Sequence, residues 1–243
     1  MNQISIFDLL VLAAIAGVLP ILGAVEWRRF KASCASPEGA PRLALYRSTM
    51  VQAWLVAFTV MALFLLLGRQ PAELGIRWPS GPLLPWALLV AAGLAGALLW
   101  GLHSARHAGP KQRERVRQAL GSLAHFMPRG IAERRAWSAM SVTAGITEEL
   151  AYRGYLLWVF AAVVPTGWAI VLASLLFGLQ HAYQGLAGIV RTALLGAALG
   201  GLYLASNSLL LPILVHILID LLQGVTLRTY LSGKESCAPR LTQ

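Results

Sequence analysis

Long apolar stretches, separated by short polar segments, run along most of the chain. A helix needs about 20 mainly apolar residues to cross a hydrocarbon core of about 30 Å, so each stretch is predicted to span a membrane. The predicted spans are residues 4–25, 49–67, 83–102, 137–160, 169–184, 189–205 and 209–225. The sixth and seventh are short, and for these a tilted or partly re-entrant helix is the alternative. The pattern therefore predicts an all-α, polytopic transmembrane bundle of about seven spans.

The composition indicates the same class of protein. Of the 243 residues, 57% are hydrophobic and 12% are charged, and the mean hydropathy is +0.65. These values exclude a disordered chain, and a count of two cysteines excludes a disulfide scaffold. The formal net charge of +10 would by itself also fit a nucleic-acid-binding protein.

The positions of the cations favour a membrane topology over nucleic-acid binding. Of the 20 Lys and Arg residues, 17 lie in predicted cytoplasmic segments or, for Arg191, at the cytoplasmic end of a span. Arg69 and Arg77 lie in a predicted external loop, and Arg153 lies deep inside a span. Because Lys and Arg concentrate in cytoplasmic loops, the N-terminus is predicted outside and the C-terminus in the cytoplasm. Cys34 and Cys237 fall on the cytoplasmic side and are expected to stay reduced. We expect the lipid bilayer, and no nucleic acid, as a partner.

A basic loop at residues 103–136 also contains a helical pattern. Its apolar residues recur at helical spacing opposite the cations and are Val116, Ala119, Leu120, Leu123 and Met127. Such a helix lies on an anionic membrane surface or packs as a charged helix on its own protein, and the sequence leaves both open.

Away from the ends of the predicted spans stand four charged side chains: Glu148, Glu149, Arg153 and Asp220. Each costs roughly 2.5 to 3.5 kcal/mol at the centre of a bilayer if it is unpaired, which marks them as a functional group facing the interior. Glu149 and Arg153 are four residues apart and can form an ion pair on one helix. Glu148 is then left without a local countercharge, as suits a general acid or base.

Two histidines on later spans complete a candidate site. His216 lies four residues before Asp220 and can share its helix face, and His181 lies on a different span. In one chemistry, Glu148 and His181 activate a water that attacks an amide carbonyl, while His216 and Asp220 bind the oxyanion or orient the substrate. In the other, these four residues hold a divalent metal such as zinc that activates the water.

These residues form three motifs that resemble a known family. Residues 148–153 read E-E-x-x-x-R, residues 177–181 read F-x-x-x-H, and residues 216–220 read H-x-x-x-D. In this order, on successive hydrophobic helices, they resemble the CPBP family of type II CAAX prenyl endopeptidases and bacterial Abi proteins related to bacteriocin processing and self-immunity. The resemblance covers roughly residues 137–223.

The resemblance implies an intramembrane glutamic endopeptidase that needs no metal or other cofactor. It implies that Glu148 is the base, that His181 is its partner on the water, and that His216 and Asp220 form the oxyanion side. Glu149 and Arg153 would support the site, and Phe177 would shape it. An ionised Asp cannot donate a hydrogen bond to an oxyanion, so Asp220 is expected to orient His216.

The resemblance also implies three regions. These are an N-terminal three-span region at residues 1–136, which includes the basic loop, a four-span catalytic core at 137–227, and a cytoplasmic tail at 228–243. The Leu-, Ala- and Arg-rich composition indicates a bacterial inner membrane. The expected substrate is then a leader-bearing peptide or a membrane-anchored protein.

Buried acids and histidines also occur in the proton relays of transporters, so a non-enzymatic transporter or immunity scaffold is the alternative class. Transporters often contain two related halves, and these motifs occur only in the C-terminal half of the chain. That asymmetry favours an enzyme.

Overall fold

The computed structural model describes residues 4–34 and 41–232, and in these ranges the chain forms helices and no strand. The N-terminal helices are α1 (Ile6–Ala13), η1 (Ala14–Val18), α2 (Leu19–Ser33), α3 (Arg42–Leu66), η2 (Pro71–Leu74) and α4 (Leu84–Arg106). The helices of the basic loop are α5 (Pro110–Leu120) and η3 (Gly121–His125). The C-terminal helices are α6 (Ile131–Glu149), η4 (Leu150–Leu156), α7 (Leu157–Ala161), α8 (Thr166–Gln180), η5 (Ala182–Gln184), α9 (Leu186–Ser206) and α10 (Leu210–Leu231).

A helix lies at each of the seven predicted spans. Five described helices are long and apolar enough to cross a membrane, namely Ile6–Ser33, Arg42–Leu66, Leu84–Arg106, Leu186–Ser206 and Leu210–Leu231. The predicted fourth span coincides with the continuous run of α6, η4 and α7, and the fifth coincides with α8, which is shorter. The chain is thus an all-helical integral membrane protein, and the seven-span count stays a prediction.

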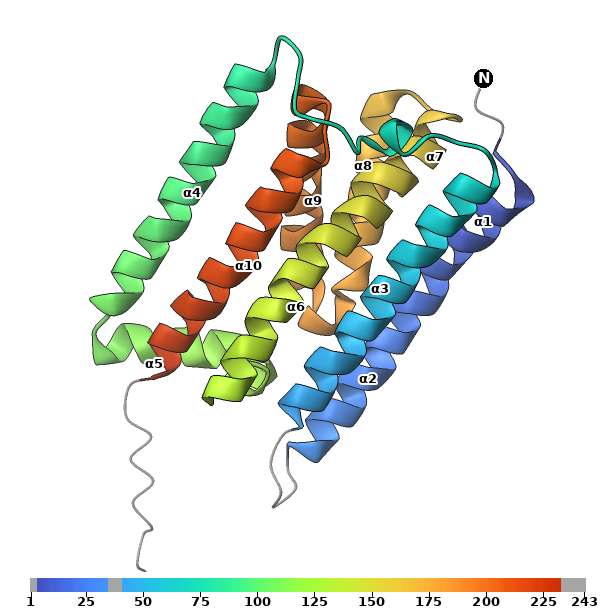
Figure 1. Cartoon of the computed structure of the whole chain (residues 1–243). Helices are drawn as coiled ribbons and strands as arrows, with labels where there is room; N and C mark the ends of the chain where they lie inside the picture. Colours follow the sequence, from blue (N-terminus) through green and yellow to red (C-terminus); the bar gives the residue numbers. More distant parts are fainter. Residues whose placement is uncertain (1–3, 35–40, 233–243) are drawn as a thin grey trace, which may run out of the picture.

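The helices run between two ends of one bundle (Figure 1). The start of α1, the η2 segment and the turn between α9 and α10 lie at one end, and α5 lies across the other end beside the last turn of α10. The turn after α9 is tight because Asn207 adopts a left-handed conformation with φ of 51°. Helix α10 extends to Leu231, beyond the predicted end of the seventh span at residue 225. Cys237 and most of the predicted tail lie outside the described residues.

Glycines allow the helices that carry the candidate residues to approach closely. A Cβ at Gly145 of α6 would lie 3.1 Å from the main-chain nitrogen of Ile217 on α10. A Cβ at Gly196 of α9 would lie 3.1 Å from Phe177 Cδ1, and one at Gly200 would lie 3.3 Å from Ile170 Cγ2, both on α8. Gly196 and Gly200, which are four residues apart in a G-x-x-x-G pattern, therefore serve helix packing inside the monomer, as is common in membrane bundles.

The N-terminal helices pack directly on η4 and α8. One buried cluster includes Ile15 of η1, Phe64 of α3, Tyr155 of η4 and Phe177 of α8. At the edge of this cluster, buried Asp8 accepts hydrogen bonds from Arg69 at 2.7 and 2.8 Å and from the Tyr155 hydroxyl at 2.9 Å. This network ties α1 and the loop before η2 to the segment that follows the E-E motif.

The basic loop packs on the end of α10. Arg113 of α5 donates to the carbonyl oxygens of Thr229, Ala108 and Ala105. Arg117 donates to the Leu231 carbonyl at 3.4 Å. Cations suit this position because the last carbonyls of a helix carry a partial negative charge. The contacts favour a charged helix packed on its own protein, the second of the two readings for this loop.

Candidate active site

The E-E-x-x-x-R motif lies where an α-helix changes into a π-helix. Glu149 is the last residue of α6, and Arg153 lies in the π-helical segment η4. Arg153 Nη1 is 2.8 Å from Glu149 Oε1, as the spacing predicts, and both side chains are buried. Arg153 also donates to the Gly196 carbonyl at 3.2 Å. Short π-helical segments are rare and occur often at functional sites.

His216 of α10 lies between three carboxylates. Its Nδ1 is 2.7 Å from Glu149 Oε1, and its Nε2 is 3.8 Å from both Glu148 Oε2 and Asp220 Oδ2. A carboxylate only accepts hydrogen bonds, so the proton on Nδ1 is donated to Glu149. The short hydrogen bond that orients the ring is therefore the one that His216 donates to Glu149. The expectation that Asp220 orients His216 is corrected in this respect, because Asp220 lies beyond hydrogen-bond distance.

The four charged side chains of the candidate site differ in how much of each is exposed. The side chains of Glu149 and Arg153 are 0% and 4% exposed, whereas those of Glu148 and Asp220 are 25% and 32% exposed. Glu149 and Arg153 thus form the buried support for His216. Glu148 and Asp220 are the carboxylates that a reactant can reach.

His181 comes to the group from the end of α8. Its Nδ1 lies 2.9 Å from the Phe177 carbonyl oxygen, and a carbonyl only accepts, so Nδ1 carries the proton. In the neutral ring Nε2 is then left as an acceptor. The described contacts join His181 to the other residues through the Phe177 ring rather than through a direct hydrogen bond.

Phe177 stands at the centre of the constellation. Its ring centroid is 5.1 Å from that of His181 and 5.9 Å from that of His216. The Arg153 guanidinium carbon lies 4.2 Å from the same centroid, a cation–π contact. Phe177 is 1% exposed, so it acts as a packed wall between the two histidines and fixes their separation.

The donor set for a metal does not form in the described part of the chain, where no three His, Cys, Asp or Glu side chains are arranged to hold an ion. Of the four residues that the metal-dependent alternative requires, His216 Nε2 lies 3.8 Å from both Glu148 Oε2 and Asp220 Oδ2. Metal dependence stays a prediction for the chelation experiment.

Sequence reasoning missed two features of the site. It gave Glu149 a supporting role and paired it with Arg153, but it did not predict that Glu149 also fixes His216. It also did not single out Tyr152, a core residue whose buried hydroxyl has no hydrogen-bond partner among the described residues. Such atoms are uncommon in folded proteins. The only sequence signal for Tyr152 was its place beside Arg153 within the motif.

One comparison with known proteins matches this region. Residues 133–222 match the family model described as type II CAAX prenyl endopeptidase Rce1-like. No curated protein and no solved structure matches the chain. The match covers α6 to most of α10, which carry all three motifs, and it confirms the family resemblance found from them. It supports a CAAX-type intramembrane protease in general terms.

Proposed function

Because residues 133–222 are similar to the type II CAAX prenyl endopeptidases, we propose that the chain hydrolyses a peptide bond of a membrane-associated protein with a water activated by Glu148 and His181. The observation that carries this proposal is the position of His216. Glu149 holds it at 2.7 Å, and its free nitrogen faces the accessible carboxylates of Glu148 and Asp220.

Water activation follows from the hydrogen-bonding capacity of two side chains. A water molecule has two O–H donors, and both an ionised Glu148 and the Nε2 of a neutral His181 accept hydrogen bonds. A water held by both is oriented with its lone pairs toward a bound carbonyl. Glu148 then takes one proton as the attack proceeds, which is general base catalysis.

His216 supplies the oxyanion side. Its Nδ1 proton goes to Glu149, so Nε2 donates to a developing oxyanion only when the ring is doubly protonated. The carboxylates of Glu148, Glu149 and Asp220 balance that charge. Asp220 thus acts as an electrostatic partner of the imidazolium, in place of the orienting role expected from the sequence. A fixed donor that needs no reorganisation is effective at such a position.

The bonds and protons balance without a covalent intermediate. The water oxygen forms a bond to the carbonyl carbon, its proton passes to Glu148, and the carbonyl oxygen becomes an oxyanion near His216. Glu148 returns the proton to the amide nitrogen as the C–N bond breaks. The products are one new carboxyl group and one new amine.

The substrate class follows from the setting of the site. The three motifs lie on helices of an integral membrane protein, so the cleaved bond belongs to a peptide or protein that is itself in or on the bilayer. We propose a leader-bearing peptide or a membrane-anchored protein of the bacterial inner membrane.

The test is processing of candidate membrane substrates by the wild type and by Glu148→Gln, His181→Ala and His216→Ala variants. Each variant is expected to lose at least about 100-fold in rate, because general base and oxyanion contributions are each of that order. Retained cleavage by Glu148→Gln would contradict the glutamic mechanism.

Chelation of the purified protein separates the two water-activating chemistries. Full activity in a strong chelator supports activation by Glu148 and His181, and loss that added metal restores supports the metal-dependent form. If no variant accumulates an uncleaved substrate, the transporter or scaffold class becomes the better explanation.

A further inference from the structure

A second site lies at the end of the bundle where α5 crosses the other helices. It is a cavity of about 740 Å³, within the range of ordinary small-molecule pockets. Its walls come from α5 and η3, from the connection that leads into α6, and from the last turn of α10. None of the described residues that line it belongs to the three motifs.

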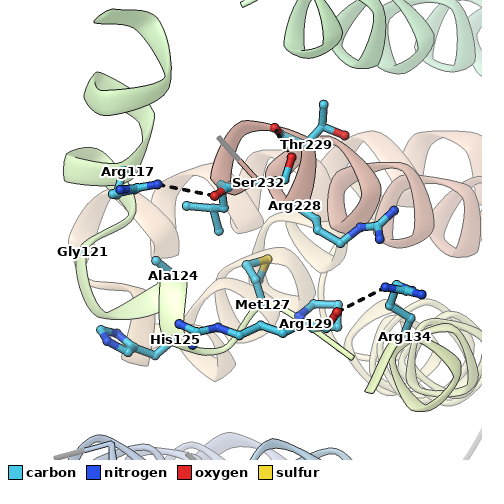
Figure 2. A pocket seen from close by; sticks show the side chains of 12 residues that line it. Arg117, Gly121, Ala124, His125, Met127, Arg129, Arg134, Arg228, Thr229 and Ser232 are labelled. Atoms are coloured by element: carbon cyan, nitrogen blue, oxygen red, sulfur yellow. Dashed lines mark hydrogen bonds between the residues drawn. The ribbon is translucent and has the colours of Figure 1, made fainter. Parts of the chain in front are cut away.

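The cavity is lined by four arginines, namely Arg117, Arg129, Arg134 and Arg228. His125 also lines it, and no Asp or Glu is among its described lining residues. Figure 2 shows Arg228 of α10 and Arg134 of α6 approaching each other on one side, with Arg117 on the other. Like charges brought together from three helices repel one another unless an anion lies between them.

Glu133, next to Arg134 in the sequence, is engaged by two main-chain nitrogens and by Arg42. The Glu133 carboxylate accepts from the main-chain nitrogens of Arg129 and Gly130 at 2.6 and 3.3 Å and pairs with Arg42 at 3.5 Å. The hydrogen bonds of Arg117 and Arg134 go to main-chain carbonyls, those of Leu231 and Arg129. A carbonyl satisfies one donor and leaves the guanidinium charge uncompensated.

The geometry points to a binding site for the phosphodiester headgroup of an anionic phospholipid. Planar guanidinium groups match phosphate oxygens with paired hydrogen bonds. The cavity lies where the apolar helices α4 and α10 end, which is the depth of lipid headgroups on the predicted cytoplasmic side (Figure 1). Apolar atoms of Met127 and Leu231 also line it, which suits the glycerol and first acyl carbons. This site is independent of the proposed proteolysis.

Lipid binding there has a structural consequence. Arg117, Arg134 and Arg228 belong to α5, α6 and α10, and the last two helices carry Glu149 and His216. A headgroup held by Arg134 and Arg228 therefore joins the ends of the two helices whose contact orients the candidate site. We expect anionic lipid to stabilise the folded bundle.

The test measures lipid binding by the full chain in nanodiscs. Native mass spectrometry and thermal unfolding are compared in phosphatidylglycerol and in phosphatidylcholine. The wild type is expected to prefer phosphatidylglycerol and to unfold at a higher temperature in it, with the difference reduced by salt. In the variant Arg117→Gln/Arg134→Gln/Arg228→Gln, the affinity for phosphatidylglycerol relative to phosphatidylcholine is expected to fall by at least about tenfold. Each cation near a membrane surface contributes about a factor of five to that affinity.

A matched control removes the same charge from exposed arginines outside the cavity, as Arg106→Gln/Arg115→Gln/Arg135→Gln. It is expected to keep the preference, and an equal loss in the control would overturn the site in favour of a general charge effect. Inorganic phosphate or glycerol phosphate in neutral nanodiscs forms the other arm. Stabilisation by these ions equal to that by phosphatidylglycerol would overturn the lipid assignment. If the triple variant does not fold, the wild type alone still tests the lipid assignment. A wild type that shows no preference for phosphatidylglycerol at low salt would overturn that assignment.

Discussion

Glu148 and Glu149 are adjacent residues of one type, yet their surroundings give them opposite tasks. Glu149 is fully buried and accepts from both Arg153 and His216, whereas the Glu148 side chain is 25% exposed and lies 3.8 Å from the same histidine. Both partners bind Glu149 Oε1, and its other oxygen, Oε2, has no hydrogen-bond partner among the described residues but is too deeply buried for a substrate to reach. We therefore expect Glu148 to be the chemical group and Glu149 the structural one.

Replacement by glutamine separates these tasks. Glu149→Gln leaves the buried Arg153 without a countercharge and is expected to lower the free energy of unfolding by about 3–5 kcal/mol. Glu148→Gln is expected to change stability by less than about 1 kcal/mol while activity is lost. Thermal or denaturant unfolding in one detergent, run beside a cleavage assay, measures both. Equal destabilisation by the two variants would contradict the division.

At the scale of elements, the site depends on how closely α6 approaches α10. Gly145 lies one helical turn before Glu149, and a Cβ there would be 3.1 Å from Ile217 nitrogen and 3.3 Å from the Ile213 carbonyl oxygen. These are main-chain atoms of α10, which move only with the whole helix.

Gly145→Ala is therefore expected to push the two helices apart and lengthen the contact between Glu149 and His216. Over-packing of this kind costs roughly 1–3 kcal/mol, and activity should fall more than stability does. Gly96→Ala on α4 is the control, because nothing lies within 4 Å of its added Cβ. Normal activity in Gly145→Ala would show that this spacing is not critical.

The start of α6 gives a pH-dependent prediction. Burial raises the pKa of the Glu133 carboxyl, but hydrogen bonds from the Arg129 and Gly130 main-chain nitrogens and the Arg42 guanidinium outweigh it, so this pKa lies below the ordinary value of 4.5. A lowered pKa in the folded state stabilises the fold fully above the ordinary pKa, and the effect is lost as the pH falls through the lowered pKa.

Glu133→Gln should thus destabilise the protein at neutral pH by about 1 kcal/mol, as expected for a helix-capping carboxylate. The difference from wild type should shrink as the pH drops below 4.5. Unfolding curves of both proteins from neutral to acidic pH check this, and a difference that does not depend on pH would rule out the capping role.

The sequence predicted the helices more fully than it predicted the contacts between them. Apolar length located a helix at each predicted span, and i,i+4 spacing gave the pair of Glu149 and Arg153. The hydrogen bond from His216 to Glu149 joins residues 67 positions apart, and periodicity within one helix carries no such information. The arginine cavity was missed for the same reason, because Arg117 and Arg228 line one cavity only when α5 packs on the end of α10.

At the scale of the whole molecule, the two ends of the bundle differ in character. One end holds Arg77, hydrogen-bonded to the Asn207 carbonyl at 2.7 Å, and the network of Asp8 with Arg69. The opposite end holds α5 and the arginine cavity (Figure 1). Because basic segments stay on the cytoplasmic side, the end with α5 and the arginine cavity is predicted to face the cytoplasm.

Single cysteines at the two ends test that orientation in cells. With Cys34 and Cys237 replaced, Ser80→Cys before α4 is expected to react with a membrane-impermeant maleimide in intact spheroplasts. Ser122→Cys, in η3, should react only after the membrane is broken, because it lies at the end that bears the excess cations. Both serines are exposed, so a lack of labelling reports the membrane rather than burial in the protein. The reverse pattern would place the arginine cavity outside, and labelling of both in intact spheroplasts would be incompatible with an odd number of spans between residue 80 and residue 122.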